Sequence, residues 1–544
     1  MSTDGYRPAR AIRVESSAMA ENAEERGLLA RFAGLFLPSR EHSVLSAAML
    51  LMVATMLSRV VGYLRDAYVA YAFGAGPVTD AYVAAFTLPD LINHLASGGA
   101  ISISFIAIYT RYLAQKKEEE ASRAFSIIVS VLSVGLVALV VVAELAAPWF
   151  VAFMFPDFTA EQRELCITLT RVLLPAQLFF VVGGVVAAVQ QTQRRFFIPA
   201  FAPILYTVFI IAGGVFLGAQ LGIMALALGA LAGSFAGPFL MNALGAAQSG
   251  IRFRFLFQPR DPAFREWFRM SVPLMLGVSV ILADDWIMRY FASGGDGAIT
   301  RINYAKRLLQ VPAGMLGQAA GIASLPFFAR LYSEGKREQY AATVNNSITK
   351  LGALSLLASA WMVAGAVPIV DVAFRRGQFE MADTLGTAAF FMWFSLALVF
   401  WSVQGLYARA FYAAGQSVLP MVAATTVTLV SIPVYWFCQH EMGVTGLAVA
   451  SNIAILLHTA TLALLLHRAQ LVSLGGIDWK ELSKALAVAI VAGVLSSLAA
   501  GGFAYGTGRW MMVGKLGMIT LTWAAATLAG LWLTRSSLLQ LLRR

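Results

Sequence analysis

Cysteine, histidine and charged residues are all scarce in this chain. Its 544 residues include 2 cysteines and 5 histidines, and 13% of the residues are charged, against about 25% in a soluble domain. Cys166 and Cys438 each lie in an apolar stretch, without a CxxC partner or a neighbouring histidine, which gives no support to a metal or redox motif. We therefore expect no metal site and no cofactor, and we interpret both cysteines as small buried side chains.

The chain also lacks a polar stretch long enough for a folded domain outside a membrane. Hydrophobic residues make up 59% of it, and the mean hydropathy is +0.72. A spanning helix needs about 20 apolar residues, and such runs recur from Leu45 to Leu533. This predicts an all-α polytopic membrane protein with fourteen spans, at 45–72, 79–108, 124–147, 166–190, 199–218, 221–246, 268–292, 300–329, 346–373, 384–412, 418–437, 443–466, 482–504 and 511–533.

The first 43 residues are polar and arginine-rich, and they lack the apolar core and cleavage site of a signal peptide. We expect them to form a flexible cytoplasmic tail before an uncleaved first helix. The fourteen spans, the first helix included, are expected to form two six-helix lobes and two extra helices. The expected divisions are an N-lobe at 44–247, a cytoplasmic linker at 248–267, a C-lobe at 268–467, and a last pair of spans with the C-terminal tail at 468–544.

Basic residues follow the even-numbered spans, which predicts that those loops and both termini face the cytoplasm. They are Arg111, Lys116, Lys117, Arg123, Arg194, Arg195, Arg252, Arg254, Arg260, Arg265, Lys336 and Arg337, with Arg543 and Arg544 at the end. The net charge of +11 is then mostly topological, and anionic lipid headgroups are its expected counter-charge. The charges are scattered without a motif, so we expect no nucleic-acid partner.

The sequence shows a weak internal repeat at a shift of about 220 residues. Span 2 and span 8 each place a proline, a phenylalanine and a tyrosine at the same separations; these are Pro89, Phe105, Tyr109, Pro312, Phe328 and Tyr332. Internal repeats are typical of transporters, whose two lobes rock about a central site. Chance similarity between apolar helices is the alternative.

Ionisable side chains gather inside spans 1, 2, 7 and 8, where each is costly unless it faces water or a partner. They are Arg59, Arg65, Asp66, Asp80, Asp90, His94, Asp284, Asp285, Arg289, Arg301, Lys306 and Arg307. Helix geometry places Arg59 and Arg65 about 120° apart, so both can border one cavity. Pro312 is expected to kink span 8 just after Lys306 and Arg307.

Cations from two lobes that face one space would form a site for an anion such as a pyrophosphate, because guanidinium groups pair bidentately with phosphate oxygens. We expect Arg59, Arg65, Lys306 and Arg307 to supply these cations. The residues expected to balance them or take part in gating are Asp66, Asp80, Asp284 and Asp285.

Simpler interpretations stay open. Arg65 and Asp66 can form a structural ion pair, and Arg301 can extend toward the interface. Asp284 and Asp285 can form a cation or proton site, or can pair with Arg289 one turn later.

Several motifs resemble those of the MurJ (MviN) family, the lipid II flippases of peptidoglycan synthesis. The N-terminal signature is carried by 57–66 (LSRVVGYLRD), 73–76 (FGAG), 79–81 (TDA) and 88–89 (LP). Further matches are 198–203 (IPAFAP), 304–308 (YAKRL) with Pro312-x-Gly314, and 411–413 (FYA). The resemblance covers about residues 44–540 and implies the fourteen-helix, two-lobe fold of the multidrug, oligosaccharidyl-lipid and polysaccharide exporters.

The resemblance also implies a role for particular residues. Ser58, Arg59, Arg65, Asp66 and Asp80 stand at the family's polar cluster of spans 1 and 2, and Arg307 stands at its span 8 arginine, all lining a cationic cavity. The chain departs from the family at Asn93 (usually arginine), Lys306 (usually acidic), Gln310 (usually glutamate), Gln416 (usually aspartate) and Met288 (aspartate in some sodium-binding relatives). Asn93 and Ser58 are still expected to bind substrate, whereas ion coupling stays open.

The implied function is a flippase that moves lipid II, an undecaprenyl-pyrophosphate-linked peptidoglycan precursor, from the cytoplasmic to the periplasmic leaflet of the inner membrane by alternating access. The expected partners are lipid II or a similar polyprenyl-pyrophosphate glycolipid, membrane lipids and cell-wall synthesis enzymes. The alternatives are a flippase for another polyprenyl-linked glycan and a non-transporting paralogue in cell-wall assembly. A drug exporter is disfavoured because the cavity would repel cations, and an enzyme because no acid–base constellation is seen.

Overall fold

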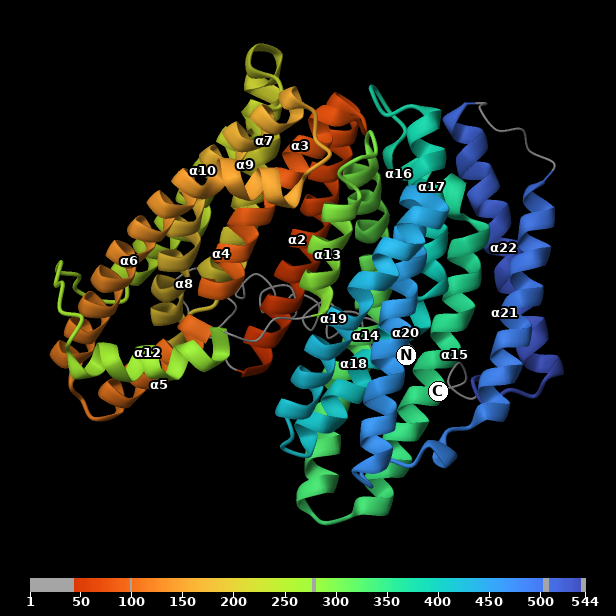
Figure 1. Ribbon diagram of the computed structural model, residues 1–544. Helices are drawn as coiled ribbons and strands as arrows, with labels where there is room; N and C mark the ends of the chain where they lie inside the picture. Colours follow the sequence, from red (N-terminus) through yellow and green to blue (C-terminus); the bar gives the residue numbers. More distant parts are fainter. Residues whose placement is uncertain (1–43, 98–99, 276–279, 502–507, 540–544) are drawn as a thin grey trace, which may run out of the picture. The chain divides into compact units, whose positions relative to one another are not determined.

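The computed structural model describes residues 44–97, 100–275, 280–501 and 508–539, and every regular element within them is a helix (Figure 1). The predicted all-α fold is therefore confirmed. The N-terminal tail at 1–43 and the terminal Arg543 and Arg544, which entered the topology prediction, lie outside the described residues.

The helices of the first half follow the predicted spans, and several spans are built from more than one helix. They are α2 (Val44–Phe73), α3 (Pro77–Ala85), α4 (Thr87–Ser97), α5 (Ala100–Ala114), α6 (Glu118–Met154), α7 (Ala160–Leu173), α8 (Ala176–Thr192), α9 (Phe197–Leu221), α10 (Met224–Ser234), the π-helix η1 (Phe235–Met241), α11 (Asn242–Ala247) and α12 (Pro262–Met275).

The second half is also helical throughout its described residues. Its elements are α13 (Val280–Phe291), α14 (Ala298–Ser333), α15 (Arg337–Ala364), α16 (Ala366–Phe374), α17 (Met381–Leu396), α18 (Leu398–Ala413), α19 (Val418–Met442), η2 (Gly443–Thr445), α20 (Gly446–Arg468), η3 (Leu474–Gly476), α21 (Trp479–Ala500) and α22 (Arg509–Leu533).

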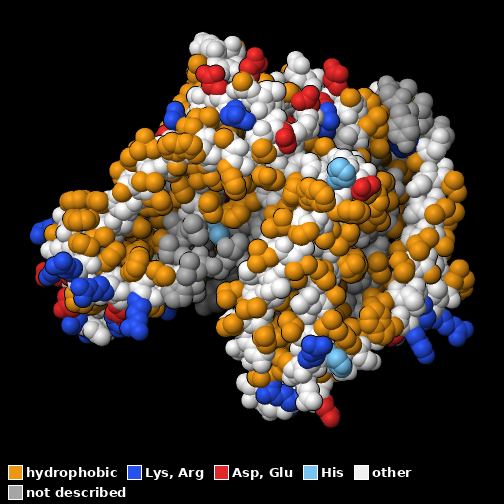
Figure 2. All heavy atoms as spheres, viewed as in Figure 1, with side chains coloured by type: hydrophobic (Ala, Val, Ile, Leu, Met, Phe, Trp, Pro, Cys, Tyr) orange, Lys and Arg blue, Asp and Glu red, His pale blue; other side chains and the backbone are white. Residues whose placement is uncertain are grey.

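Eight helical segments among the described residues are long and apolar enough to cross a membrane, and the α17 and α18 pair, bent by 45°, makes a ninth. The other expected spans are interrupted, as at α3 to α5, or carry several charges, as α14 does. Figure 2 shows hydrophobic side chains covering the sides of the helices and charged ones gathering near their ends. This is the surface of a multi-pass membrane protein, and the number fourteen stays a prediction.

The described helices form two compact units. Unit 1 comprises the residues up to Gly62 together with Leu91–Val142 and Val172–Met275, and unit 2 comprises Tyr63–Asp90, Ala143–Arg171 and the residues from Leu276 on. Unit 2 thus includes short segments of the first half as well as the whole second half. The division into lobes at 44–247 and 268–467 stays a prediction.

Each unit has a hydrophobic core that contains aromatic residues of the sequence repeat. In unit 1, Phe105 and Tyr109 are stacked with ring centroids 5.2 Å apart, within a cluster built by α5, α6, α8 and α12. In unit 2, Phe328 packs on Tyr340 at 6.1 Å, in a cluster built by α14, α15, α18 and α20. The repeated aromatic residues therefore pack α5 against its neighbours in unit 1 and α14 against its neighbours in unit 2.

Candidate functional site

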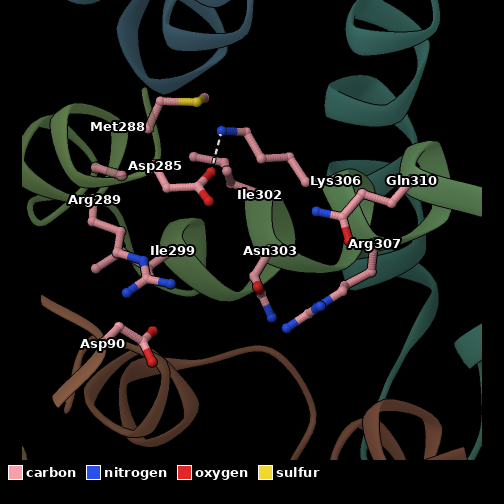
Figure 3. Close-up of a pocket in the computed structure, with 11 residues that line it drawn as sticks. Asp90, Asp285, Met288, Arg289, Ile299, Ile302, Asn303, Lys306, Arg307 and Gln310 are labelled. Carbon is pink, nitrogen blue, oxygen red and sulfur yellow. Dashed lines mark hydrogen bonds and ion pairs between the residues drawn. The ribbon is translucent and has the colours of Figure 1, made fainter. Parts of the chain in front are cut away.

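A cavity of about 140 Å³ lies beside α14 in unit 2 (Figure 3). α4, α13 and α14 supply its lining, and its polar residues are Asp90, Asp285, Arg289, Asn303, Lys306, Arg307 and Gln310. Three of the predicted site residues, Asp285, Lys306 and Arg307, thus share one space. Charged groups are stable among apolar helices only where water or a partner is at hand, so the partners of each cation decide what the cavity can do.

Lys306 is held by both acidic residues of α13. Its Nζ lies 2.5 Å from Asp284 Oδ2 and 2.5 Å from Asp285 Oδ1. Asp284 also accepts hydrogen bonds from the Tyr435 hydroxyl and, at 3.2 Å, from the Ser451 hydroxyl. The ammonium is therefore neutralised within unit 2, and Lys306 is the direct ion-pair partner of both aspartates.

Arg307 has a looser environment than Lys306. Its Nε lies 3.7 Å from Asp66 Oδ2, and 49% of its side chain is exposed. Asp66 is held more closely by Arg65, whose Nε and Nη2 lie 3.0 and 2.7 Å from Asp66 Oδ1. Arg65 and Asp66 thus form the expected ion pair, and Arg307 is the second, more distant cation of the same carboxylate.

Arg289 is one of the ionisable residues inside the predicted spans, but it was not predicted to line the site. It donates a hydrogen bond from Nη1 to Thr87 Oγ1 at 2.8 Å, and in Figure 3 its guanidinium lies on the side of the cavity where Asp90 lies. Asn303 and Arg307 point to the same side of α14 in that view. Residues four apart lie on the same face of a helix. Arg289 is four residues after Asp285, and Asn303 is four residues before Arg307. This spacing could have placed Arg289 and Asn303 at the site.

The formal charges of this cluster cancel. Arg65, Arg289, Lys306 and Arg307 supply four positive charges, and Asp66, Asp90, Asp284 and Asp285 supply four negative ones. Breaking a buried ion pair is costly because it leaves one charge without a partner. A bound anion is therefore expected to pair with a cation whose present carboxylate partner is distant. Among Arg65, Lys306 and Arg307, the last meets that condition best, because it is the most exposed and has the longest contact with its carboxylate.

Asp80 lies away from the cavity and caps the N-terminus of α14. Its Oδ1 accepts hydrogen bonds from the Thr300 backbone N–H at 2.8 Å and from the Thr300 hydroxyl at 2.6 Å. The helix needs such an external acceptor because its own N-cap residue is Gly297, which has no side chain. Asp80 therefore joins α3 of the first half to α14 of the second half within unit 2.

Further contacts in unit 2 tie α2 to α16 and to the segment that follows α16. The Gln378 N–H donates to the Tyr71 carbonyl at 2.9 Å, and the Tyr63 hydroxyl donates to the Ala373 carbonyl at 3.0 Å. Gly74 has a φ of +66°, and a Cβ there would lie 2.7 Å from the Gln378 carbonyl oxygen. The close approach therefore requires glycine at this position.

The other predicted site residues lie in unit 1. Ser58 and Arg59 are on α2, and Asn93 is on α4; Arg59 is exposed, and the other two are half-buried. The positions of the two units relative to each other are not determined, so a shared cavity with Arg307 stays a prediction for these three.

Arg301 pairs with an acidic residue of another helix, and its extension toward the interface stays a prediction. Arg301 Nη2 lies 2.8 Å from Asp383 Oδ1, at the N-terminal end of α17. No sequence pattern indicates this partner, because the two residues are far apart in the chain and meet only through the packing of α14 on α17.

Solved structures with a similar fold belong to one class of membrane protein. An inward-facing multidrug resistance MATE family transporter of the MOP superfamily has a TM-score of 0.61 and 16% identity, covering 77% of this chain and 98% of that chain. A structure of "Lipid II flippase MurJ, inward closed conformation" has a TM-score of 0.72 and 21% identity, covering 88% of this chain and 98% of that one. The helices and their arrangement thus define a polytopic membrane protein with the fold of these transporters.

Sequence comparison identifies the family. Residues 69–519 match the model of the family described as "Lipid II flippase MurJ". The lipid II flippase MurJ of Burkholderia cenocepacia is 27% identical over 423 residues, 76% of this chain and 82% of the relative. A probable lipid II flippase MurJ of Rhizobium tropici is 26% identical over 472 residues, 84% and 86% of the two chains. The chain belongs to the lipid II flippase MurJ family, which confirms the resemblance drawn from its motifs.

Proposed function

We propose that this protein moves lipid II from the cytoplasmic to the periplasmic leaflet of the inner membrane by alternating access. Membership of the MurJ family and the transporter fold support the assignment. The observation that carries it is the half-exposed guanidinium of Arg307, which borders a polar cavity among apolar helices. A pyrophosphate is a ligand that such a group binds well, since its fork of N–H donors matches phosphate oxygens.

In this proposal Arg307 is the first phosphate ligand, and Arg289 is the second. Arg307 can turn toward a phosphate at small cost because its ion pair with Asp66 is 3.7 Å long. Asp66 keeps its closer partner Arg65 when Arg307 turns away, so no carboxylate is left alone. Ser58, Arg59 and Asn93 are proposed as further ligands of the headgroup.

Lys306 has a different proposed role from Arg307. Its two carboxylate contacts at 2.5 Å hold its ammonium in the acidic pair of α13, so it is less available to a phosphate. We propose that Lys306 chiefly fixes α13 against α14, and that it reaches the substrate only if the cavity rearranges. The membrane potential is the proposed drive, worth about 2.3 kcal/mol per charge per 100 mV.

Asp80 and the contacts of Tyr63, Tyr71 and Gln378 are proposed to form the gate at the periplasmic side. They join first-half and second-half segments through a few hydrogen bonds, which can break and re-form without disturbing a hydrophobic core. Both termini are proposed to face the cytoplasm, and cell-wall synthesis enzymes are proposed as further partners.

The test is complementation of a bacterial strain depleted of its own lipid II flippase. The wild-type chain should restore growth, Arg307→Ala should not, and both proteins should be present in the membrane at equal amounts. Arg330→Ala is the matched control, because Arg330 lies on the same helix and pairs with Glu334 at 2.7 Å at its exposed end. Failure of a well-expressed wild-type chain would contradict the proposal.

A flippase for another polyprenyl-linked glycan is the second candidate. The departures from the family's usual residues at Asn93 and Lys306 favour it, and Lys306 is neutralised by two aspartates. Rescue of a strain that lacks a flippase for such a glycan, with no rescue of the lipid II flippase strain, would select this candidate.

A further inference from the structure

The segment 251–260 (IRFRFLFQPR) follows α11 and precedes α12 in unit 1, and most of it has no regular secondary structure. It alternates arginine with phenylalanine, and both kinds of side chain are exposed. Phe253, Phe255 and Phe257 are 53%, 65% and 52% exposed, and Arg252 and Arg254 are also exposed. Water does not favour three exposed phenylalanine rings in a row, so this exposure indicates a surface that meets something else.

Two serines on α6 hold the backbone of this segment in place. The Ser126 hydroxyl accepts from the Arg254 N–H at 3.1 Å, and the Ser130 hydroxyl accepts from the Leu256 N–H at 3.0 Å. The Ser126 proton is shared between the Ser122 carbonyl at 2.7 Å and the Arg252 carbonyl at 3.3 Å. Two residues of extended chain rise about 6.6 Å, and one helical turn rises about 5.4 Å. These two rises are similar, so the N–H groups of Arg254 and Leu256, two residues apart, can bond to Ser126 and Ser130, which are one helical turn apart.

α12 continues the same surface and is fixed to unit 1. The Trp267 indole donates to the Ile101 carbonyl at 3.2 Å, and Arg111 forms a bidentate ion pair with Glu266 at 2.7 and 2.6 Å. Figure 1 shows α12 running across the ends of the longer helices of unit 1. Its outer side exposes Phe268 and Met270. A helix in this orientation, with exposed apolar side chains, is typical of the interface of a bilayer.

Two acidic residues of the following turn and α12 pair with other cations. Glu266 pairs with Arg111, and Asp261 pairs with Arg123 at 3.7 Å. No ion pair of Arg252 or Arg254 occurs among the residues that the structure describes. Aromatic rings and arginines together favour the zone where acyl chains meet charged headgroups, because rings enter the apolar side and guanidinium groups meet phosphates.

We propose that residues 251–260, held on α6 by Ser126 and Ser130, form a binding site for the headgroups of anionic phospholipids in the cytoplasmic leaflet. Arg252 and Arg254 bind the lipid phosphates, and the three phenylalanine rings lie at the boundary of the acyl chains. The site lies in unit 1 and involves none of the residues proposed to bind the transported substrate.

The test uses the full-length protein in a neutral detergent, with phosphatidylglycerol or phosphatidylcholine added as the probe. Phosphatidylglycerol should raise the Tm of the wild type more than phosphatidylcholine does. Arg252→Gln with Arg254→Gln should remove at least half of that difference, and Phe255→Ser should reduce it. The matched control is Arg330→Gln with Lys336→Gln, which removes two cations at the C-terminal end of α14, where they pair with Glu334; it should keep the full difference.

Further arms separate the proposal from its alternatives. Inorganic phosphate at the same concentration should not reproduce the shift, because the site also needs the acyl chains. Ser126→Ala with Ser130→Ala should weaken the shift while leaving both arginines in place. If the double arginine variant has the wild-type Tm without lipid and keeps the full phosphatidylglycerol shift, the site is disproved. If that variant is unstable by itself, an unchanged shift in Phe255→Ser and in the serine variant overturns the proposal instead.

Discussion

Lys306 and Arg307 are neighbours on α14, yet they face two different regions of unit 2. Lys306 faces α13, where two carboxylates lie 2.5 Å from its Nζ and Tyr435 and Ser451 complete the hydrogen bonding of Asp284. Arg307 faces α2, where Asp66 is 3.7 Å away and already belongs to Arg65. Successive helical residues point about 100° apart, which is why two adjacent cations can meet such different surroundings.

This difference in partners gives the two cations different roles. Lys306 stabilises the fold, whereas Arg307 is available to a ligand. A buried cation with complete partners is expensive to disturb, because removing one partner leaves an uncompensated charge. A half-exposed arginine with a distant partner can exchange that partner for a phosphate. The α13 side of α14 is thus expected to set stability, and the α2 side is expected to set affinity.

The largest effect is expected on the α13 side. Lys306→Met leaves Asp284 and Asp285 without their ammonium partner, so unfolding should become easier by about 3 to 5 kcal/mol. Chemical denaturation of the purified protein in detergent measures this. Adding Asp285→Asn to Lys306→Met should recover part of the loss. A loss below about 1 kcal/mol for the single variant would mean that the pair is not buried in solution.

The next effect is expected on the α2 side and concerns binding. Arg307→Ala should leave unfolding nearly unchanged but should weaken binding of undecaprenyl pyrophosphate by about 1.5 to 3 kcal/mol, the value of hydrogen bonds to a charged group. This corresponds to roughly a 10- to 150-fold rise in Kd. Binding to the purified protein, with Arg330→Ala as control, measures it. Equal Kd values for the wild type and Arg307→Ala would remove Arg307 from the site.

A smaller effect is expected at the N-terminal end of α14. Asp80→Ala removes the acceptor of both Thr300 bonds, which should cost about 0.5 to 2 kcal/mol, as loss of a helix cap does. A reporter cysteine at the buried Ile299 should then react faster with a water-soluble thiol reagent. Asp296→Ala is the matched control, because Asp296 is exposed and lies nearby. Unchanged labelling in Asp80→Ala would show that Asp80 does not hold this region closed.

The smallest effect is expected at the opposite, exposed end of α14. Hydrogen bonds from Arg330 and then Lys336 lower the pKa of Glu334 from 4.5 to about 2. A lowered pKa contributes stability that is present above pH 4.5 and is lost as the pH falls toward 2. Glu334→Gln should therefore lower the Tm slightly at pH 7, and the difference should shrink below pH 4.5. A difference that grows with falling pH contradicts this sign.

The helical fold and the polar cluster could be predicted because hydrophobic runs and charges inside them are local features of the sequence. The ion-pair and hydrogen-bond partners of those charges could not be predicted. Lys306 meets Asp284 through the packing of α13 on α14, and Asp80 meets Thr300 across 220 residues of chain. Within the described residues of this cluster, the pair that spacing could predict is Arg65 with Asp66, because the two residues are adjacent.

No sequence pattern predicts the hydrogen bonds between the α6 serines and the backbone of residues 251–260. Ser126 and Ser130 look like ordinary small residues of an apolar span, and their role appears only when residues 252–256 lie along them. A balance between cations and aspartates was expected from the sequence, but the strength of each pairing was not. The contacts show that Arg307 is held more loosely than Arg65 or Lys306.

We propose that Arg307 binds the pyrophosphate of a lipid that the protein then moves across the membrane. The most direct measurement is the fraction of lipid II that reaches the periplasmic leaflet of spheroplasts from a flippase-depleted strain, detected with a membrane-impermeant lipid II probe. The wild type and Arg330→Ala should expose lipid II to the same extent, and Arg307→Ala should expose little more than an empty vector does. Full exposure of lipid II by Arg307→Ala would contradict the account.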